Sequence, residues 1–382
     1  METVTPFVEV ADAIIEAGGK DLNLCYQCAT CTGSCPWGWV NPLNMRLLIR
    51  LAQFGLEGYE GDDLWRCTTC NTCRLRCPRD VGIIELVRSV RTMMHESGLI
   101  PKTLRGALAN VATDGNPWAG SRADRNAWAK EILPAFDPAV HEYLLFGCCM
   151  PSYDARSRKI AQAAVRVLRA AGVTVGVLGT EESCCGESVR RSGNEELFGR
   201  LAEDNGALFA RAGVKKILTL SPHCYHTFKN EYPEVGHKFE VVHITELMAE
   251  LLRKGKLRLG KPLDVTVTYH DPCYLGRHNG VFDAPREVLA ALPGVKVEEM
   301  WRTRQMSLCC GGGGGRMWIE TKVGERFGDL RVPEAVAVGA TVLTTACPYC
   351  VNMLESSRVS LDLEDKIQVK DLTELVAESL AN

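Results

Sequence analysis

The cysteines between residues 273 and 350 are the side chains of this chain best suited to chemistry. They are Cys273, the adjacent pair Cys309 and Cys310 before Gly311, and Cys347 and Cys350 on either side of Pro348-Tyr349. Adjacent cysteines rarely form a disulfide with each other, because disulfide geometry needs separated Cα atoms. Five thiols gathered from three points of one segment can instead surround a metal cluster. The segment therefore predicts a soft-metal site.

A similar cysteine layout occurs 125 or 126 residues earlier, which indicates an internal repeat. The earlier copy keeps four cysteines of the pattern: Cys148, Cys184, Cys185 and Cys224. Ser221 stands where the later copy has Cys347. A hydroxyl is a far poorer iron ligand than a thiolate, because metal-bound thiols lose their proton readily. We therefore expect the active cluster in the second copy. The first copy is expected to hold a simpler centre or to have a structural role only.

The N-terminal region contains two cysteine runs of identical spacing, each C-x2-C-x2-C-x3-C-P. This is the bacterial ferredoxin pattern for two 4Fe-4S clusters, in which the fourth cysteine of each run serves the other cluster. The first cluster would use Cys25, Cys28, Cys31 and Cys77, and the second would use Cys67, Cys70, Cys73 and Cys35. Structural zinc sites are the alternative, but their cysteine pairs lack the third cysteine and the trailing proline.

The composition of the 382-residue chain argues against several classes of protein. A net charge of −3 offers no general attraction to nucleic acid or to an anionic membrane surface. We find no run of about 18 apolar residues that could cross a membrane, and the first residues are acidic where a signal peptide is basic. We expect a cytoplasmic protein without a transmembrane span, whose 18 cysteines bind metal rather than form disulfides. Peripheral docking on a membrane subunit at the inner face stays open.

The pattern of apolar residues divides the chain into four segments. Residues 1–100 show a helical period after each cysteine run and predict a mainly α-helical ferredoxin-like domain. Residues 101–140 are rich in Gly and Pro and predict a connector. Residues 141–258 and 259–382 alternate strands with helices and predict two pseudo-symmetric α/β domains, so the fold class is α+β multidomain. The strands are expected at 143–146, 173–177, 216–220, 265–269, 295–297 and 342–345. Cysteines then follow the carboxyl ends of strands, where ligand crevices form.

Other residues near the cysteines leave more than one interpretation open. Cys149 is either a spare ligand or a small buried hydrophobe. Glycines 311–315 lack the Lys-Ser/Thr of a phosphate-binding loop, and we expect them to let the backbone approach an inorganic core. Three histidines are proton donors, extra ligands or merely structural: His223, His226 and His270. Three tryptophans are expected to pack beside ligands and exclude water rather than relay electrons: Trp37, Trp39 and Trp65.

The later cysteine set resembles the CCG cysteine-rich domain of the heterodisulfide reductase family, and its recurrence within the chain makes the resemblance specific. A twin cysteine-run domain followed by two CCG copies resembles the D-type subunits of that family over nearly the whole chain. The resemblance implies two 4Fe-4S cubanes and a non-cubane iron-sulfur cluster in the second CCG copy, where a disulfide or related acceptor is reduced. A further iron-sulfur centre in the first copy would have only the four cysteines named above.

Two functions are compatible with this resemblance. In the first, the chain is the catalytic subunit of a heterodisulfide-reductase-like oxidoreductase. In the second, it is an electron-transfer module without its own substrate, linking a flavoprotein to a quinone-linked membrane subunit or to a reductase such as a class II benzoyl-CoA reductase complex. The chain has no flavin or haem motif, so we expect a multisubunit complex with a flavoprotein or other redox subunits, and a membrane cytochrome b is a further candidate partner. Architecture alone does not choose among these settings.

Overall fold

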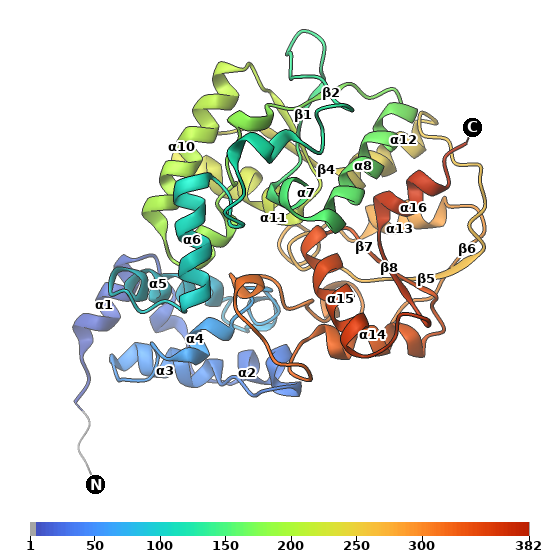
Figure 1. Cartoon of the computed structure of the whole chain (residues 1–382). Helices are drawn as coiled ribbons and strands as arrows, with labels where there is room; N and C mark the ends of the chain where they lie inside the picture. Colours follow the sequence, from blue (N-terminus) through green and yellow to red (C-terminus); the bar gives the residue numbers. More distant parts are fainter. Residues whose placement is uncertain (1–4, 382) are drawn as a thin grey trace.

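A computed structural model of the chain describes residues 5–381 and contains three regions (Figure 1). An N-terminal helical region carries both cysteine runs. Residues 141–258 form a first α/β half and residues 259–381 form a second α/β half, which lie side by side. The two halves and the N-terminal region share one cluster of buried side chains that includes most of the cysteines. A second buried cluster lies between the helices of the two halves.

Short helices surround the two cysteine runs of the N-terminal region. They are α1 (Val8–Glu16), α2 (Thr30–Ser34), α3 (Met45–Phe54), α4 (Asp62–Arg66) and α5 (Ile83–Glu96). Helix α3 begins where the Asn44 side chain accepts a hydrogen bond from the Leu47 amide, and it ends at Gly55 in a left-handed conformation. One face of α3 and much of α5 are buried. The helices predicted after each cysteine run are therefore confirmed.

The segment 101–140 contains a helix that the sequence analysis did not predict. Helix α6 (Lys102–Asp114) buries Leu104, Ala107, Leu108 and Val111, which share one helical face. Pro101 and Gly106 make this period hard to recognise in the sequence. However, Pro101 precedes the first helical residue and so interrupts no helical hydrogen bond. The connector thus begins with a packed helix rather than with irregular chain.

Each half contains a four-stranded parallel sheet, and the strand order is the same in both: β2-β1-β3-β4 and β6-β5-β7-β8. The strands of the first half are β1 (Tyr143–Phe146), β2 (Val175–Gly176), β3 (Lys216–Thr219) and β4 (Glu240–His243). Those of the second half are β5 (Val265–Tyr269), β6 (Val295–Val297), β7 (Val342–Thr345) and β8 (Gln368–Asp371). The predicted strands are present. The edge strands β4 and β8 were not predicted, because half or more of their residues are polar.

Helices join the two halves through reciprocal contacts. The first half has α7 (Cys149–Tyr153), α8 (Ala155–Ala170), α9 (Glu187–Arg191), α10 (Glu195–Arg211), α11 (Pro222–His226) and α12 (Ile244–Arg253). The second has α13 (Asp283–Ala290), α14 (Gly328–Ala337), α15 (Pro348–Ser360) and α16 (Leu372–Glu378). Helix α8 packs on α16, and α13, the counterpart of α8, packs on α12, the counterpart of α16. Such reciprocity is what a twofold relation between two similar halves requires.

One buried arginine ties all three regions together. The Arg91 side chain of α5 is completely buried and donates hydrogen bonds to four backbone carbonyls. Two of these carbonyls belong to the N-terminal region, at Leu64 and Cys67, one to Arg191 of the first half and one to Gly314 of the second half. A guanidinium can satisfy so many acceptors because its donors form a fixed planar fork.

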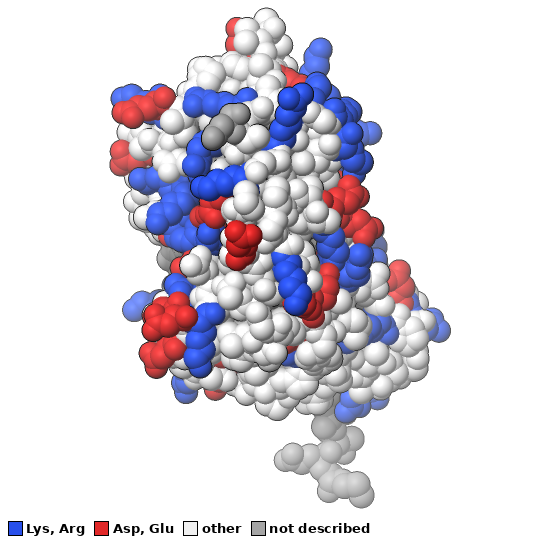
Figure 2. Space-filling view, turned by 90° about the vertical axis from the view of Figure 1, so that its right-hand side faces the viewer, with Lys and Arg blue, Asp and Glu red and all other residues white. Residues whose placement is uncertain are grey.

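The surface carries both signs of charge, in keeping with the net charge of −3. On the face drawn in Figure 2, basic and acidic side chains are interspersed around an uncharged band. Within residues 5–381, no helix has both the length and the apolar character needed to span a membrane.

Candidate metal centres

The two N-terminal cysteine runs interleave in space. Cys31 and Cys35 of the first run line one cavity together with Cys67, Cys70 and Cys73 of the second run. Burial raises the pKa of the Cys35 thiol, and the neighbouring Cys70 and Cys67 raise it further. Desolvation and then the charges of Cys28 and Cys77 raise the pKa of Tyr26, so Cys77 lies within electrostatic reach of the first run. The two runs therefore adjoin each other, and the crossed ligand sets stay a prediction.

The backbone of both runs follows the same strained path. Gln27 and Ala29 have φ angles of 69° and 67°, and the equivalent Thr69 and Asn71 have φ angles of 50° and 66°. Left-handed conformations at residues other than glycine cost of order 1–3 kcal/mol each and persist only where the surroundings enforce them. Because the two loops repeat this strain, they wrap their thiols in the same way. The free thiols and curved backbones fit the binding of an inorganic cluster.

The second half gathers its five cysteines at the carboxyl ends of its central strands. Cys273 follows β5, Cys347 and Cys350 flank the start of α15 after β7, and Cys309 and Cys310 come from the loop before the glycines. All five are buried. The Gly311 amide donates to Cys309 Sγ at 3.3 Å. Burial raises the pKa of Cys347, but contacts with Cys350 and His223 outweigh it and lower the pKa to about 5.

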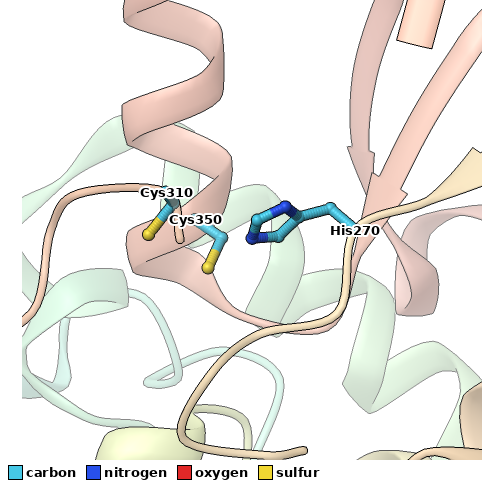
Figure 3. Close-up of side chains that lie close together, drawn as sticks. All are labelled: His270, Cys310 and Cys350. Atoms are coloured by element: carbon cyan, nitrogen blue, oxygen red, sulfur yellow. The ribbon is translucent and has the colours of Figure 1, made fainter. Parts of the chain in front are cut away.

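His270 lies against the same thiols. A ring nitrogen of His270 and the sulfurs of Cys310 and Cys350 all lie within 4.8 Å of one another (Figure 3). Burial and then Arg331 lower the pKa of His270 to about 3, so the ring is neutral. The Arg331 Nε donates to His270 Nδ1 at 3.2 Å, which leaves the proton of the neutral ring on Nε2. The ring thus presents an N–H donor on its free nitrogen rather than a lone pair for metal binding.

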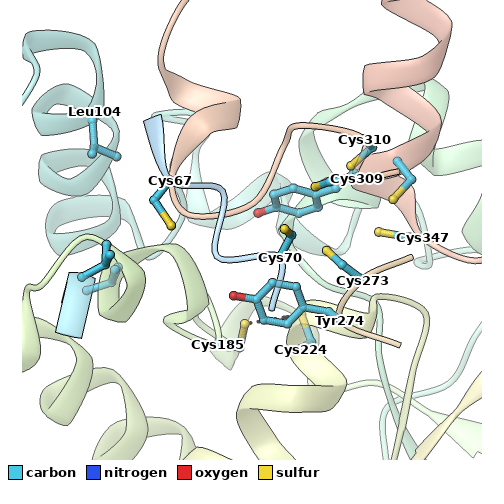
Figure 4. Packing of buried hydrophobic residues seen from close by; sticks show 14 of the residues in the cluster. Cys67, Cys70, Leu104, Cys185, Cys224, Cys273, Tyr274, Cys309, Cys310 and Cys347 are labelled. Carbon is cyan, nitrogen blue, oxygen red and sulfur yellow. Dashed lines mark hydrogen bonds between the residues drawn. The ribbon is translucent and has the colours of Figure 1, made fainter. Parts of the chain in front are cut away.

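The first half gathers five thiols as well, because Cys149 joins the four cysteines of the repeat. All five line a single cavity: Cys148, Cys149, Cys184, Cys185 and Cys224. The sulfurs of Cys185 and Cys224 are 3.4 Å apart (Figure 4). The Gly186 amide donates to Cys184 Sγ at 3.4 Å, as Gly311 does to Cys309 in the second half. This half thus brings five thiols to one cavity, one more than the repeat supplies.

Side chains of the first half complete the surroundings of the second. The ring of His223 is stacked between Tyr274 and Tyr349, at centroid distances of 4.2 and 4.4 Å. Its Nδ1 lies 3.1 Å from Glu187 Oε1. Burial lowers the pKa of His223, but the charge of Glu187 and the contact with Cys347 raise it well above its usual value. His223 could be recognised in the sequence as a candidate site residue. Glu187 and both tyrosines could not, because their partners are distant in the chain.

The other histidine of this region, His226, is unlike His223. Burial and then the charge of Arg191 lower the pKa of His226 well below its usual value. Its ring packs edge-on against the rings of Tyr274 and His278, at centroid distances of 5.3 and 4.9 Å. A neutral histidine in an aromatic cluster fits the structural interpretation.

The loop of the second cysteine run contacts the thiols of the second half. Thr68 Oγ1 lies 3.7 Å from Cys309 Sγ, and Thr69 Oγ1 shares a hydrogen bond of 2.8 Å with the Tyr274 hydroxyl. Arg277 Nε donates to the Cys70 carbonyl at 2.6 Å. Figure 4 shows Cys67 and Cys70 beside this group of cysteines. Two thiol sets from distant parts of the chain thus lie next to each other.

The glycines after Cys310 allow this contact. A Cβ at Gly313 would lie 2.5 Å from the Thr68 carbonyl oxygen, and one at Gly314 would lie 2.4 Å from the Cys67 carbonyl oxygen. Both distances are shorter than any side chain tolerates. These two glycines therefore face the cysteine loop of the N-terminal region, whereas the sequence analysis expected them to face an inorganic core.

The tryptophans divide into two groups. Trp37 and Trp65 are buried, and Trp37 Nε1 donates to the Arg66 carbonyl at 2.7 Å. Trp39 is 55% exposed, so the expectation that it excludes water is wrong. Arg302 stacks over its ring instead, at 4.7 Å.

Comparison with known proteins matches two family models to this chain. A 4Fe-4S dicluster domain matches residues 24–82, and a cysteine-rich CCG domain matches residues 143–229 and 267–355. The D-type subunit of the dihydromethanophenazine:CoB–CoM heterodisulfide reductase of Methanosarcina barkeri is 33% identical over 392 aligned positions, which cover 94% of each chain.

Two longer proteins match at higher identity. The probable iron-sulfur-binding oxidoreductase FadF of Bacillus subtilis is 41% identical over 84% of this chain and 47% of its own length. The EtfAB:quinone oxidoreductase of Syntrophomonas wolfei is 38% identical over 88% of this chain and 48% of its own length. The chain therefore spans about half the length of these two relatives.

A crystal structure of a hypothetical protein from Helicobacter pylori resembles the whole chain. Its TM-score is 0.56, with 10% sequence identity, and the match covers 95% of this chain and 72% of that protein. At this identity the likeness concerns the fold alone.

Proposed function

This chain belongs to the family of D-type heterodisulfide reductase subunits, and from that premise we propose that it is the iron-sulfur electron-transfer subunit of an oxidoreductase complex. We propose further that a disulfide or a related acceptor is reduced at the second half. The observation that carries this proposal is the contact between the loop of Cys70 and the thiol set of Cys309. It provides a short buried connection from the N-terminal cysteines to the second half.

The positions of the cysteines support the following proposal for the cluster ligands. We assign Cys25, Cys28, Cys31 and Cys77 to one cubane, and Cys67, Cys70, Cys73 and Cys35 to the other. The five cysteines of the second half would hold the non-cubane cluster: Cys273, Cys309, Cys310, Cys347 and Cys350. When bound, iron-sulfur clusters accept and release single electrons at potentials that depend on hydrogen bonds to sulfur and on solvent exposure.

The thiols differ in exposure, and this difference sets the direction in which electrons would pass through the chain. Cys28 is exposed, whereas Cys67, Cys70 and all five cysteines of the second half are buried. A partner can therefore approach the first cysteine run directly but reaches the second half only through the protein. Thr69, Tyr274 and Arg277 hold the two buried thiol sets together and exclude water between them.

Donors around the second half favour negative charge on its sulfurs. The Gly311 amide points at Cys309, and the neutral His270 ring presents an N–H beside Cys310 and Cys350. Protonated His223 lies beside Cys347 and is kept protonated by Glu187. Hydrogen bonds to sulfur raise the reduction potential of such a site. His223 also holds a proton beside Cys347, and a thiolate released from a cleaved disulfide at this site would need one.

The exposed edge of the first run fits an acidic redox partner. Arg46 and Arg50 line the same surface depression as Cys25 and Tyr26. Arg79 lies close enough to Tyr26 to affect its pKa. A basic rim of this kind attracts a partner of opposite charge and speeds its docking. We propose a flavoprotein or another redox subunit as this partner.

A second candidate function is electron transfer without a substrate of its own. Its support is the EtfAB:quinone oxidoreductase, which is more similar in sequence to this chain than the D-type reductase subunit is. In that setting the second half passes electrons to a quinone-linked or membrane subunit, such as a cytochrome b, or to a separate reductase.

Anaerobic spectroscopy separates the two functions. The purified chain is reduced with dithionite, freed of excess reductant and mixed with a disulfide, and its EPR spectrum is followed. Reoxidation by the disulfide, lost in Cys310→Ser while both cubanes remain reducible, is expected for the reductase. Reoxidation only by a quinone-linked partner, with no response to any disulfide tested, would contradict the first function and support the second.

A further inference from the structure

We propose that the first half holds an iron-sulfur cluster of its own and that Cys149 supplies the fifth thiolate, in place of the missing cysteine at position 221. The inference rests on the proposed iron-sulfur chemistry but on neither of the proposed acceptors. It concerns a residue outside the repeating cysteine pattern, adjacent in the chain to Cys148.

The five thiols of the first half form a closed ring of contacts. Cys149 contacts Cys148 and Cys184. Cys185 contacts Cys184 and Cys224, and Cys224 in turn contacts Cys148. Each sulfur thus has two sulfur neighbours, which is the arrangement expected around one polynuclear centre. A cysteine that served only as a core hydrophobe would need no sulfur neighbours.

Backbone strain at Cys148 brings the two neighbouring side chains to the same cavity. Its φ angle is 73°, a left-handed conformation that is costly for a residue with a Cβ. Its counterpart in the second half, Cys273, is not one of the described residues with a positive φ angle. The strain therefore occurs in the half in which the residue after this cysteine, Cys149, also lines the cavity.

The serine at position 221 takes no part in the ring. Ser221 is completely buried, its hydroxyl has no hydrogen-bond partner within the described residues, and it does not line the cavity of the five thiols. In the second half the arrangement is reversed. Cys347 occupies the place equivalent to Ser221, and Tyr274 occupies the place equivalent to Cys149 and hydrogen-bonds Thr69 instead. Each half thus has five thiols, with the fifth at a different position.

A buried cation stands beside the additional thiol. Arg125 is 3% exposed, and its Nη1 donates to Cys149 Sγ at 3.4 Å. The same guanidinium donates to the Ser183 carbonyl at 3.1 Å and lies 3.9 Å from Glu182. A fixed cation near a thiol favours the thiolate that a metal requires. The second half has Tyr274 at the position equivalent to Cys149, so it has no thiol at this position.

Apolar side chains form part of the cavity lining. They are Ala107, Leu108 and Val111 of α6, together with Pro117 and Trp318, while Glu187, Ser188 and His223 add polar groups. An apolar cover limits solvent access and thereby lowers the local dielectric constant around a metal site. Helix α6 therefore has a role here, as the cover of the first-half site.

The test compares iron content in a matched set of variants of the full chain, purified anaerobically. Cys149→Ser is expected to lose one cluster, about four irons per chain if the cluster resembles a 4Fe-4S centre. Ser221→Ala is expected to keep the iron content of the natural protein. The double variant Cys149→Ser/Ser221→Cys is expected to regain iron, because it moves the fifth thiol to the position used in the second half. EPR signals from both cubanes show in each case that the chain is folded.

Two outcomes would overturn the proposal. One is an unchanged iron and sulfide content in Cys149→Ser. The other is a loss of iron in Ser221→Ala as large as that in Cys149→Ser. If Cys149→Ser does not accumulate, Mössbauer spectra of Cys310→Ser decide the question, since iron must remain beyond that of the two cubanes. Disulfide reduction is measured on the same samples, so that failure of the proposed function is recognised separately from failure of this ligand assignment.

Discussion

The two α/β halves have the same sheet order and the same glycine amide on the first cysteine of the adjacent pair, yet they differ in what surrounds their thiols. The second half lies against the loop of Cys70. The thiols of the first half line a cavity under α6, together with Glu187, Ser188 and His223. Duplication therefore supplies two similar thiol sites, whereas contacts with the N-terminal region distinguish their roles.

The halves are also not independent of each other. Glu187 and His223 belong to the first half, but they lie against Tyr274, Tyr349 and Cys347 of the second. Among the described residues, the second half places no cation beside the first-half thiols. The cation beside those thiols, Arg125, comes from the connector. The second half therefore depends on the first for part of its electrostatic environment.

Removing one thiol from each half in turn tests whether the two thiol sites have different roles. Cys310→Ser is expected to abolish turnover and the non-cubane signal, because Cys310 contacts both Cys309 and Cys350, while both cubanes stay reducible. Cys185→Ser, the matched change in the first half, is expected to leave the second-half signal intact. Turnover with the proposed acceptor and EPR of the reduced protein measure both. Full activity of Cys310→Ser would refute the assignment of the second half.

The next largest effect is expected from the crossing of the N-terminal runs. Cys77→Ser should damage the cluster of Cys25, Cys28 and Cys31, because Cys77 lies within electrostatic reach of the first run and the ferredoxin pattern crosses its ligands. Cys35→Ser should damage the other cluster, which adjoins the second half, and should therefore reduce turnover more. EPR and Mössbauer spectra distinguish the two clusters. Damage in Cys77→Ser confined to the cluster of Cys67, Cys70 and Cys73 would show that the ligands do not cross.

Arg91→Met removes the side chain that joins both halves to the N-terminal region. It leaves four buried carbonyls without their donor, so we expect a loss of about 3–5 kcal/mol of stability, with a lower melting temperature and weaker coupling between the N-terminal clusters and the second half. Arg253→Met, on the exposed surface, should cost about 0–1 kcal/mol. Thermal unfolding under anaerobic conditions compares the two. Equal melting temperatures would show that Arg91 does not hold the regions together.

The smallest effect is expected from the pair of Glu187 and His223, through which the second half depends on the first. Burial raises the pKa of Glu187, but His223 outweighs this and lowers it to about 2, while the pKa of His223 is raised. The contribution of His223 is therefore present below its unfolded pKa of about 6.5 and is lost as the pH rises through the higher folded value. The contribution of Glu187 is present above about pH 4.3 and is lost as the pH falls through about 2.

Glu187→Gln should thus lower stability by roughly 1–3 kcal/mol near pH 6 and by less at strongly alkaline pH. It should also shift the potential of the second-half site, although the substituted residue lies in the first half. Melting temperatures from pH 6 to 10 and a redox titration provide the measurements, with Glu203→Gln as an exposed control. A pH-independent difference, or an unchanged potential, would contradict this role.

The iron-sulfur character of this protein could be predicted from its sequence alone. The spacing within Cys25–Cys35 and Cys67–Cys77 is short enough for ligand geometry to be local, so the ferredoxin pattern could be recognised without a structure. Buried central strands such as β5 and β7 were equally predictable, since continuous runs of Val, Thr and Leu are typical of parallel sheets. The repeat itself followed from equal offsets between cysteines.

The tertiary structure alone decided which thiols share a site and which sites adjoin. Cys149 joins the first-half ring because β1, β3 and the loop of Cys184 converge there, and no local spacing encodes that convergence. Gly313 and Gly314 are explained by a close approach to a loop some 245 residues earlier, rather than by the cluster beside them in the sequence. Helix α6, Glu187 and Tyr274 acquire their roles in the same way. Contacts between distant segments depend on how whole layers pack, which a pattern of neighbouring residues does not specify.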